Sequence, residues 1–168
     1  LVVNSGNANV FTWAHGETTV RKSITATAHH LKTSDENIFV ASTGVIGELL
    51  HHKQITSQIE NLTKNLKPSM FLSAAEAIMT TDTYPKGFHT EFTFENTNVK
   101  INGIAKGSGM IAPDMATMLV FIFSDINIEK HVLQKIITNC NNKTFNCITV
   151  DSDTSTSDSL FVIATGKA

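Results

Sequence analysis

Residues 88–94 read Phe88-His89-Thr90-Glu91-Phe92-Thr93-Phe94, so an aromatic or threonine side chain alternates with a polar one. A period of two residues is typical of a β-strand. The polar turn Glu95–Asn98 leads to a second run, Val99–Ala105, which we expect to be the partner strand. Further along, Thr117–Ser124 is apolar except at its ends, as expected of a strand that is buried on both faces.

Helices are predicted where apolar residues recur every three or four positions. The clearest covers residues 54–66, and its inward face is formed by Ile55, Ile59, Leu62 and Leu66. A helix over Glu17–Leu31 has an expected inward stripe of Val20, Ile24, Ala28 and Leu31. Two more are predicted at Ser69–Met79 and at residues 128–141, the latter capped by Asn127 with Val132, Ile136 and Cys140 inward.

Short strands are expected at Leu1–Val3, Ile38–Ala41 and Phe145–Val150, whereas Leu160–Ala164 fits either state. Helices and strands mix without strict alternation, which predicts an α/β (α+β) layered fold with helices covering packed sheets. No repeat, charge run or Gly/Ser/Pro-rich linker divides residues 1–168, so we treat them as one folding unit.

The composition is that of a folded domain. The chain has 168 residues, of which 41% are hydrophobic and 17% charged, and its formal net charge is −2. This excludes whole-chain disorder, and the scattered basic residues argue against nucleic-acid or membrane partners. Cys140 and Cys147 are too few for a disulfide framework, so we expect reduced thiols and a cytoplasmic protein. Because Leu1 is not an initiator methionine, we expect a piece of a longer protein.

Four polar loops punctuate the predicted elements: Asn4–Asn9, Ser42–Gly44, Thr80–Thr83 and Lys106–Gly109. Glycine, asparagine and aspartate are ordinary turn residues, so one such loop alone needs no functional explanation. Four loops that supply hydroxyls and backbone donors are typical of a site for a small polar substrate.

Thr117 stands between a glycine-rich loop and a buried apolar strand. A threonine hydroxyl needs a base to become a nucleophile, and one solution is the α-amino group of the same residue once the preceding peptide bond has been cut. That amine titrates at about pH 7.7 to 8.0 when unperturbed, so part of it is free base at neutral pH. Thr117 is therefore a candidate nucleophile, and its structural alternative is a good β-former at a strand start.

Five segments resemble, in the same order, the signatures of the ornithine acetyltransferases, the bifunctional glutamate N-acetyltransferases of arginine biosynthesis. They are Val3–Asn9, Ala41–Gly47, Ala77–Thr83, Lys106–Leu119 and Asp153–Thr156. The resemblance extends over nearly the whole chain and implies the layered fold of that family. Phe11-Thr12-Trp13 departs from the family's usual Cys-Thr-Gly.

The resemblance implies a precursor that cuts itself between Ala116 and Thr117. Thr117 would then be the N-terminus of a second chain, take an acetyl group from N-acetylornithine as acetyl-threonine, and hand it to glutamate. Thr43 and Gly44 match the family's oxyanion-hole pair, whose donors stabilise the developing negative charge.

The resemblance also implies substrate-binding residues. Lys106 matches a lysine that binds a substrate carboxylate, for which a compact ammonium is suited. Thr80 matches a substrate-binding threonine by its distance from Thr117, and the adjacent Thr81 is an open alternative.

In the family, the chain continues beyond the point that matches Ala168 and supplies a glutamate and further polar residues to the site. Residues 1–168 would thus be one fragment of the catalytic domain. No cofactor is implied, although acetyl-CoA could be a second acetyl donor, and pairs of cleaved chains are expected to form a heterotetramer. The alternative is an inert fragment or a non-catalytic ligand-binding domain of the same fold.

Other chemistry is less well supported. The acidic stretch that begins at Asp151 lacks the glycine and glutamate of an EF-hand loop. An aspartyl phosphotransferase using Asp151 and Asp153 has no room for its downstream lysine and acidic groups. The structural interpretation of this stretch is a turn in which Ser155 or Asp158 caps a helix.

No metal site is predicted. Neighbouring residues on a helix point apart, and no carboxylate completes a ligand set with the histidine pairs, so we expect surface histidines. These pairs are His29-His30 and His51-His52.

Overall fold

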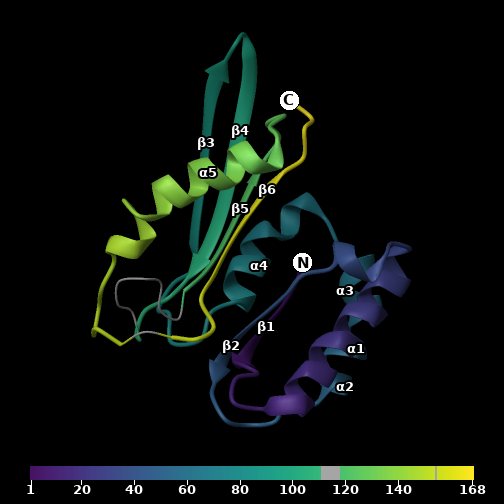
Figure 1. The fold of residues 1–168 in the computed structure, drawn as a ribbon. Helices are drawn as coiled ribbons and strands as arrows, with labels where there is room; N and C mark the ends of the chain where they lie inside the picture. The colour runs from purple at the N-terminus through teal and green to yellow at the C-terminus, as the bar shows by residue number, and fades with distance from the viewer. Residues whose placement is uncertain (111–117, 154) are drawn as a thin grey trace. The chain divides into compact units, whose positions relative to one another are not determined.

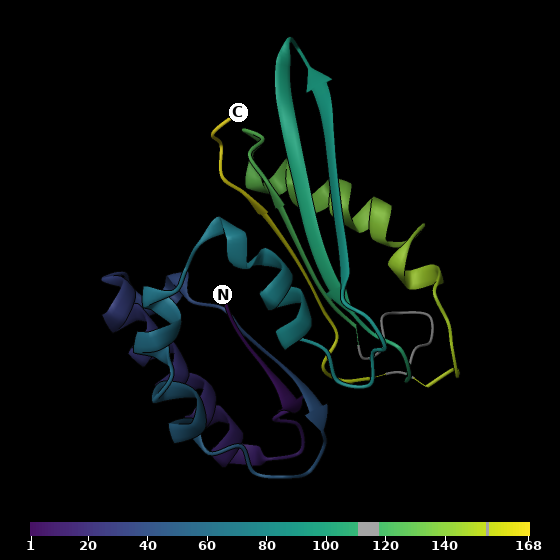
Figure 2. The same ribbon diagram turned by 180° about the vertical axis from the view of Figure 1, so that it is seen from behind.

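The computed structural model of the chain describes residues 1–110, 118–153 and 155–168. They form two compact units, Leu1–Thr80 and Thr81–Ala168, and each unit contains helices and one sheet (Figures 1 and 2). The predicted mixed α/β class is confirmed.

The first unit is built on a strand–helix–strand motif. β1 (Val2–Asn7) and β2 (Val40–Val45) pair in parallel, and α1 (Trp13–Leu31) connects them. A parallel pair needs a crossover of this kind because the chain must return to the end at which it began. The remaining elements of the unit are the 3₁₀ turn η1 (Asp35–Asn37), α2 (His52–Thr56), α3 (Ile59–Lys64), the 3₁₀ turn η2 (Pro68–Met70) and α4 (Phe71–Ala77).

The face that α1 buries is only partly the predicted one. Its buried residues are small or carry hydroxyls: Gly16, Thr19, Ser23, Thr27 and Ala28. Of the predicted aliphatic stripe, Ala28 is buried, Val20 and Ile24 are half-buried, and only Leu31 is exposed. The buried hydroxyls are tolerated because each has an acceptor: Thr19 donates to the Leu50 carbonyl at 2.7 Å, and Ser23 donates to the Thr19 carbonyl at 2.8 Å.

The continuous helix predicted over residues 54–66 is also wrong, because two short helices, α2 and α3, replace it. The Gln58 amide donates to the Ile55 carbonyl at 2.9 Å, a three-residue hydrogen bond that tightens the chain between them. Ile55 and Ile59 are buried with Leu50 in one core cluster, whereas Leu62 and Leu66 are exposed. The helix predicted at residues 69–79 is confirmed as α4.

The second unit is built on a four-stranded sheet. Its strands are β3 (Lys86–Phe94), β4 (Thr97–Lys106), β5 (Leu119–Ser124) and β6 (Ser159–Ala164), in the spatial order β3-β4-β5-β6. The β3–β4 and β4–β5 pairs are antiparallel, and β5–β6 is parallel. The predicted hairpin is confirmed, and its turn residues Glu95 and Asn96 have φ of 47° and 67°, the left-handed conformation that a two-residue hairpin turn requires.

The connection between β5 and β6 holds α5 (Lys130–Asn141) and the 3₁₀ turn η3 (Phe145–Cys147). The strand predicted at residues 145–150 is wrong: Phe145 turns back onto the cluster of Met118 and Val120, and Val150 is exposed. Glu129, not Asn127, stands at the α5 N-cap. α5 lies across one face of the sheet (Figures 1 and 2), but it has no buried residue, so the inward positions predicted for it are also wrong.

This topology gathers the second unit's polar loops at one end of the sheet. β3, β5 and β6 begin at that end and β4 finishes there, because Lys86 pairs with Ala105, Lys106 with Leu119, and Leu119 with Ser159. The loops that precede β3, follow β4 and precede β6 therefore meet.

Candidate active site

Asp82 joins two of these loops. Its carboxylate Oδ1 accepts a hydrogen bond from the Gly107 amide at 2.8 Å and an ion pair from Lys86 Nζ at 2.6 Å. The Asp82 side chain is only 1% exposed, and charge-assisted bonds of this kind are stronger than neutral ones. The start of the glycine-rich loop is thus fixed to the segment before β3.

Two further contacts hold the glycine-rich loop. The hydroxyls of Thr81 and Ser108 lie 2.7 Å apart. The Met110 amide donates to Asp151 Oδ2 at 2.6 Å, which ties this loop to the one before β6. The three loops therefore form one hydrogen-bonded assembly.

Lys106 is 1% exposed at the end of β4, so its ammonium lies inside the unit. Burial lowers the pKa of Lys106, and the negative charges of Asp82 and Asp158 oppose that effect. We call Asp82, Lys86, Lys106 and Asp158 the sheet-end cluster. It holds two acidic and two basic side chains, which compensates the cost of burying charge.

Of this cluster, the sequence predicted only Lys106 as a site residue; Asp82, Lys86 and Asp158 were missed, and Asp158 was considered only as a helix cap. No helix follows it; Asp158 precedes β6, and its Oδ1 accepts a hydrogen bond from the Met118 amide at 2.6 Å. Burial raises the pKa of the Asp158 carboxyl to about 6, against the lowering effects of the Met118 hydrogen bond and the Lys106 charge. Its Oδ2 is buried and has no hydrogen-bond partner among the described residues.

Thr43 and Gly44 lie in the first unit, near the end of β2. Thr43 is 1% exposed and lies at an irregularity of the β1–β2 ladder, where Asn7 pairs with both Val45 and Thr43. Gly44 has φ of 130°, and a Cβ there would stand 2.5 Å from the Asn7 nitrogen and 2.6 Å from the Gly6 oxygen. Only glycine fits this close approach of two backbones.

The other predicted site residues are placed less fully. Thr80 is exposed at the end of the first unit, and Thr81 is exposed at the start of the second. Ala116 and Thr117 lie outside the described residues. The structure thus places Thr81 and Lys106 in one unit and Thr43 and Gly44 in the other, and the roles of all these residues remain predictions.

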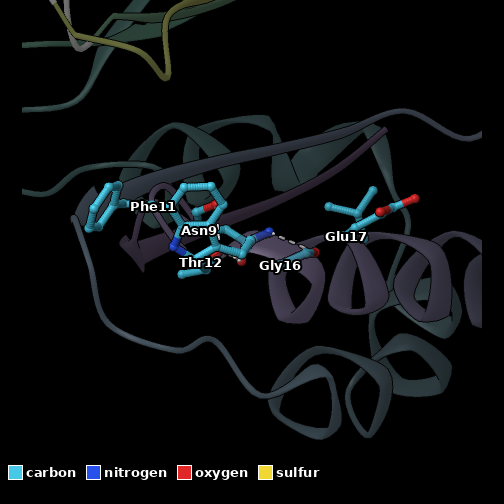
Figure 3. A pocket seen from close by; sticks show the side chains of 7 residues that line it. Asn9, Phe11, Thr12, Gly16 and Glu17 are labelled. Carbon is cyan, nitrogen blue, oxygen red and sulfur yellow. Dashed lines mark hydrogen bonds between the residues drawn. The ribbon is translucent and has the colours of Figure 1, made fainter.

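A pocket of about 390 Å³ opens at the start of α1 (Figure 3). Asn9 anchors it: its side-chain amide donates to the Gly16 carbonyl at 3.1 Å, and the Thr12 hydroxyl lies 3.2 Å from its Oδ1. Phe11 and Trp13 flank Thr12, are 73% and 80% exposed, and have φ of 60° and 50°. The segment that departs from the family pattern therefore forms the entry into α1, with Thr12 buried between two exposed aromatic residues, and no residue of the predicted catalytic site lines its pocket.

Two negative findings apply to the described residues only. Residues 1–110, 118–153 and 155–168 contain no group of three or more histidine, cysteine, aspartate or glutamate side chains arranged to hold a metal ion. Within the same ranges, no helix has the length and apolar character needed to cross a membrane.

Comparisons with known proteins give a consistent result. A family model described as the ArgJ family matches residues 1–168. Relatives named arginine biosynthesis bifunctional protein ArgJ, from Ruegeria pomeroyi and Bartonella henselae, are 51% and 52% identical and match 100% and 99% of this chain. The chain spans 41% of the length of each of these relatives.

A solved structure supports the same grouping. The crystal structure of the arginine biosynthesis bifunctional protein ArgJ from Bacillus halodurans matches with a TM-score of 0.61 and 37% identity. The match covers 68% of this chain and 60% of that one.

Proposed function

Since this chain belongs to the ArgJ family, we propose that it is part of an acetyltransferase of arginine biosynthesis. In the proposed reaction, acetyl passes from N-acetylornithine to Thr117 and then to glutamate. The observation that carries this proposal is the meeting of three polar loops where β5 begins, two residues after the candidate nucleophile in the sequence.

In the proposed first half-reaction, the Thr117 hydroxyl attacks the acetyl carbonyl carbon and its proton passes to the Thr117 α-amine. The bond from acetyl to the ornithine nitrogen then breaks, and that nitrogen takes the proton. Glutamate reverses these steps through its own amine. Donors at Thr43 and Gly44 would stabilise the oxyanion in both directions.

Lys106 is proposed to hold the substrate's α-carboxylate. An ammonium that has lost most of its water interacts strongly with an anion, since the surrounding dielectric is low. Lys106 is buried, and the charges of two neighbouring carboxyl groups act on its ammonium group. Both observations support a binding role for this lysine rather than that of a solvated surface residue.

We propose a cytoplasmic enzyme in which pairs of cleaved chains assemble, with acetyl-CoA as an optional donor and no resident cofactor. The competing possibility is a folded but inert fragment.

The intact mass of the denatured full-length protein tests the proposal. We expect two species, the second beginning Thr117-Met118-Leu119, because only that cut frees the amine. Thr117→Ala should abolish cutting and transfer, whereas Thr117→Ser keeps a hydroxyl and should retain part of both. Uncut protein that still transfers acetyl groups would contradict the mechanism.

A further inference from the structure

A second pocket, of about 620 Å³, lies in the first unit and is walled by α1 and α2 (Figure 1). Five of the residues that line it have basic side chains, and none of its described lining residues is acidic. The basic residues are Arg21, Lys22, His29, His30 and His52. Because the formal net charge of the whole chain is −2, this group of basic side chains is a local feature. We call the pocket that they line the α1–α2 pocket.

The basic side chains form a row along the pocket. Lys22 and His29 are seven residues apart in α1, close to two turns of helix, so they share a face and stand about 10 Å apart along the axis. From the other wall, α2 contributes His52, whose Nε2 lies 3.1 Å from Lys22 Nζ. A single phosphate or carboxylate group is too small to meet both ends of this row. A ligand that uses the whole row therefore carries more than one anionic group.

Lys22 and His52 restrict each other's charge. A lysine ammonium is only a donor, so its contact with His52 Nε2 requires that nitrogen to be unprotonated and the imidazole to be neutral. Desolvation lowers the pKa of His52, and the pKa is lowered further by the basic groups around it, namely Lys22, Lys53, His15 and His51. An anion that contacts both Lys22 and His52 would offset this repulsion. We therefore expect His52 to take up a proton when such an anion binds.

Acidic side chains stand around the pocket. Before its first end, Glu17 accepts from Arg21 Nη2 at 2.7 Å. Beyond its other end, the charge of His30 acts on Glu60 of α3. Asp35 of η1 accepts from a threonine hydroxyl of α1 at 2.7 Å. These carboxylates would repel a long polyanion that continued past the pocket, whose volume lies in the usual range for small-molecule sites. The surroundings thus favour a small molecule over nucleic acid or a membrane surface.

We propose that the α1–α2 pocket binds a small molecule that carries two or more phosphate groups. Lys22 and His52 hold one phosphate group, and the histidines at the end of α1 hold another. Phosphate suits donors from two helices better than carboxylate does, because a phosphate monoester offers three acceptor oxygens and a charge of about −1.5 to −2 at pH 7. The inference does not depend on the proposed acetyl transfer, since none of the described residues of the predicted catalytic site lines this pocket.

Isothermal titration calorimetry of the full-length protein tests the binding, with inorganic pyrophosphate, ATP and coenzyme A as probes at constant ionic strength. Wild type should bind pyrophosphate with a dissociation constant below about 1 mM. Lys22→Met should bind it about tenfold more weakly or worse, because a charge-assisted contact is lost. Lys135→Met removes an exposed lysine of α5, in the other unit, and should bind like wild type.

Proton uptake is measured by repeating the pyrophosphate titration at pH 7 in buffers of different ionisation enthalpy. His52→Gln keeps a side chain that can accept from Lys22 but cannot take up a proton, so fewer protons should be bound per pyrophosphate than in wild type. The phosphates of the probe titrate in the same pH range, and the difference between the two proteins removes their contribution. A merely structural histidine would leave the proton count unchanged.

Each outcome decides for or against the pocket. The inference is overturned if wild type binds pyrophosphate more weakly than about 1 mM, or if Lys22→Met and His52→Gln both bind it within twofold of wild type. Binding of duplex DNA or anionic vesicles that Lys22→Met abolishes and pyrophosphate does not displace would also overturn it. Tighter binding of ATP or coenzyme A than of pyrophosphate would support it and identify the source of the phosphates. Equal binding of all three would support recognition through the phosphates alone.

Discussion

The end of β2 and the sheet-end cluster are organised by different forces. At Thr43 and Gly44 the geometry is steric, because two backbones approach so closely that a Cβ does not fit. In the sheet-end cluster it is electrostatic, because two acidic and two basic side chains act on one another, with Asp82 and Lys106 buried and Lys86 32% exposed. The first arrangement should respond to side-chain size and be indifferent to pH, whereas the second should respond to charge and to pH.

The largest effect is expected for Gly44→Ala. The new Cβ would meet the Gly6 and Asn7 backbones at a φ that favours glycine, so we expect a loss of about 3 to 5 kcal/mol in the free energy of unfolding. Urea unfolding measures this loss. Gly47→Ala is the matched control, since Gly47 has φ of 85° but open space around its Cβ position. A loss no greater than that of Gly47→Ala would show that the close approach is unimportant.

Thr43→Val is next. It keeps the shape of a buried side chain and deletes one hydroxyl donor, which at an oxyanion hole costs about 100-fold to 1,000-fold in rate, or roughly 2.7 to 4 kcal/mol. The measurement is kcat for acetyl transfer by the complete enzyme. Thr93→Val, on an exposed strand position, serves as the control. A change below threefold would make Thr43 a structural residue only.

Lys106→Met, a change in the sheet-end cluster, should have a smaller effect than the two substitutions at the end of β2. Losing a charge-assisted hydrogen bond to the substrate carboxylate should cost about 1.5 to 3 kcal/mol in kcat/KM. N-acetylornithine and glutamate should be affected alike, because each presents a carboxylate in turn. Lys100→Met is the control on the same strand, since Lys100 is 54% exposed. Equal kinetic constants for both variants would remove Lys106 from the site.

The smallest effect is a pH-dependent change in stability. The folded-state pKa of Asp158 is raised to about 6, which means that the folded protein favours the protonated carboxyl. The stabilisation by that protonated form is fully present below the unfolded-state pKa of 3.8 and is lost as the pH rises through about 6. Asp158→Asn should therefore stabilise the protein at pH 8, by about 1 to 2 kcal/mol after allowance for solvent screening, and change little at pH 3.5. Melting temperatures at the two pH values measure it. An equal change in melting temperature at both pH values would contradict the raised pKa of Asp158.

The sequence predicted correctly those elements whose formation depends on neighbouring residues in the chain. The hairpin of β3 and β4 follows from two-residue alternation and a polar turn, and α4 follows from a short helical run. The helix expected at residues 54–66 failed because only Ile55 and Ile59 join the core around Leu50, which no periodicity within the segment reveals. The inward stripe of α1 was only partly right, because small and hydroxyl-bearing residues form the fully buried face while Val20 and Ile24 are half-buried.

In the candidate site, too, the sequence does not reveal contacts between residues that are far apart in the chain. The glycine-rich loop and the strand after it stand out in the sequence because their composition is unusual. Asp158 does not, because its position depends on a hydrogen bond to Met118, 40 residues away in the chain. The burial of Lys106 and the link from Asp82 to Gly107 likewise arise only when the sheet brings distant segments together.

The pairing of β4 with β5 determines how the protein, once cut as proposed, could recover from denaturation. A cut between residues 116 and 117 leaves β4 in one product and β5 in the other, joined by a ladder from Ile101–Ser124 to Lys106–Leu119 in the middle of the sheet (Figure 1). Folding before the cut is unimolecular. Afterwards, recovery from denaturation requires two separate polypeptides to meet, so it depends on concentration. The nicked enzyme would then persist by the slowness of its unfolding, and heat damage to it would not be reversed at low concentration.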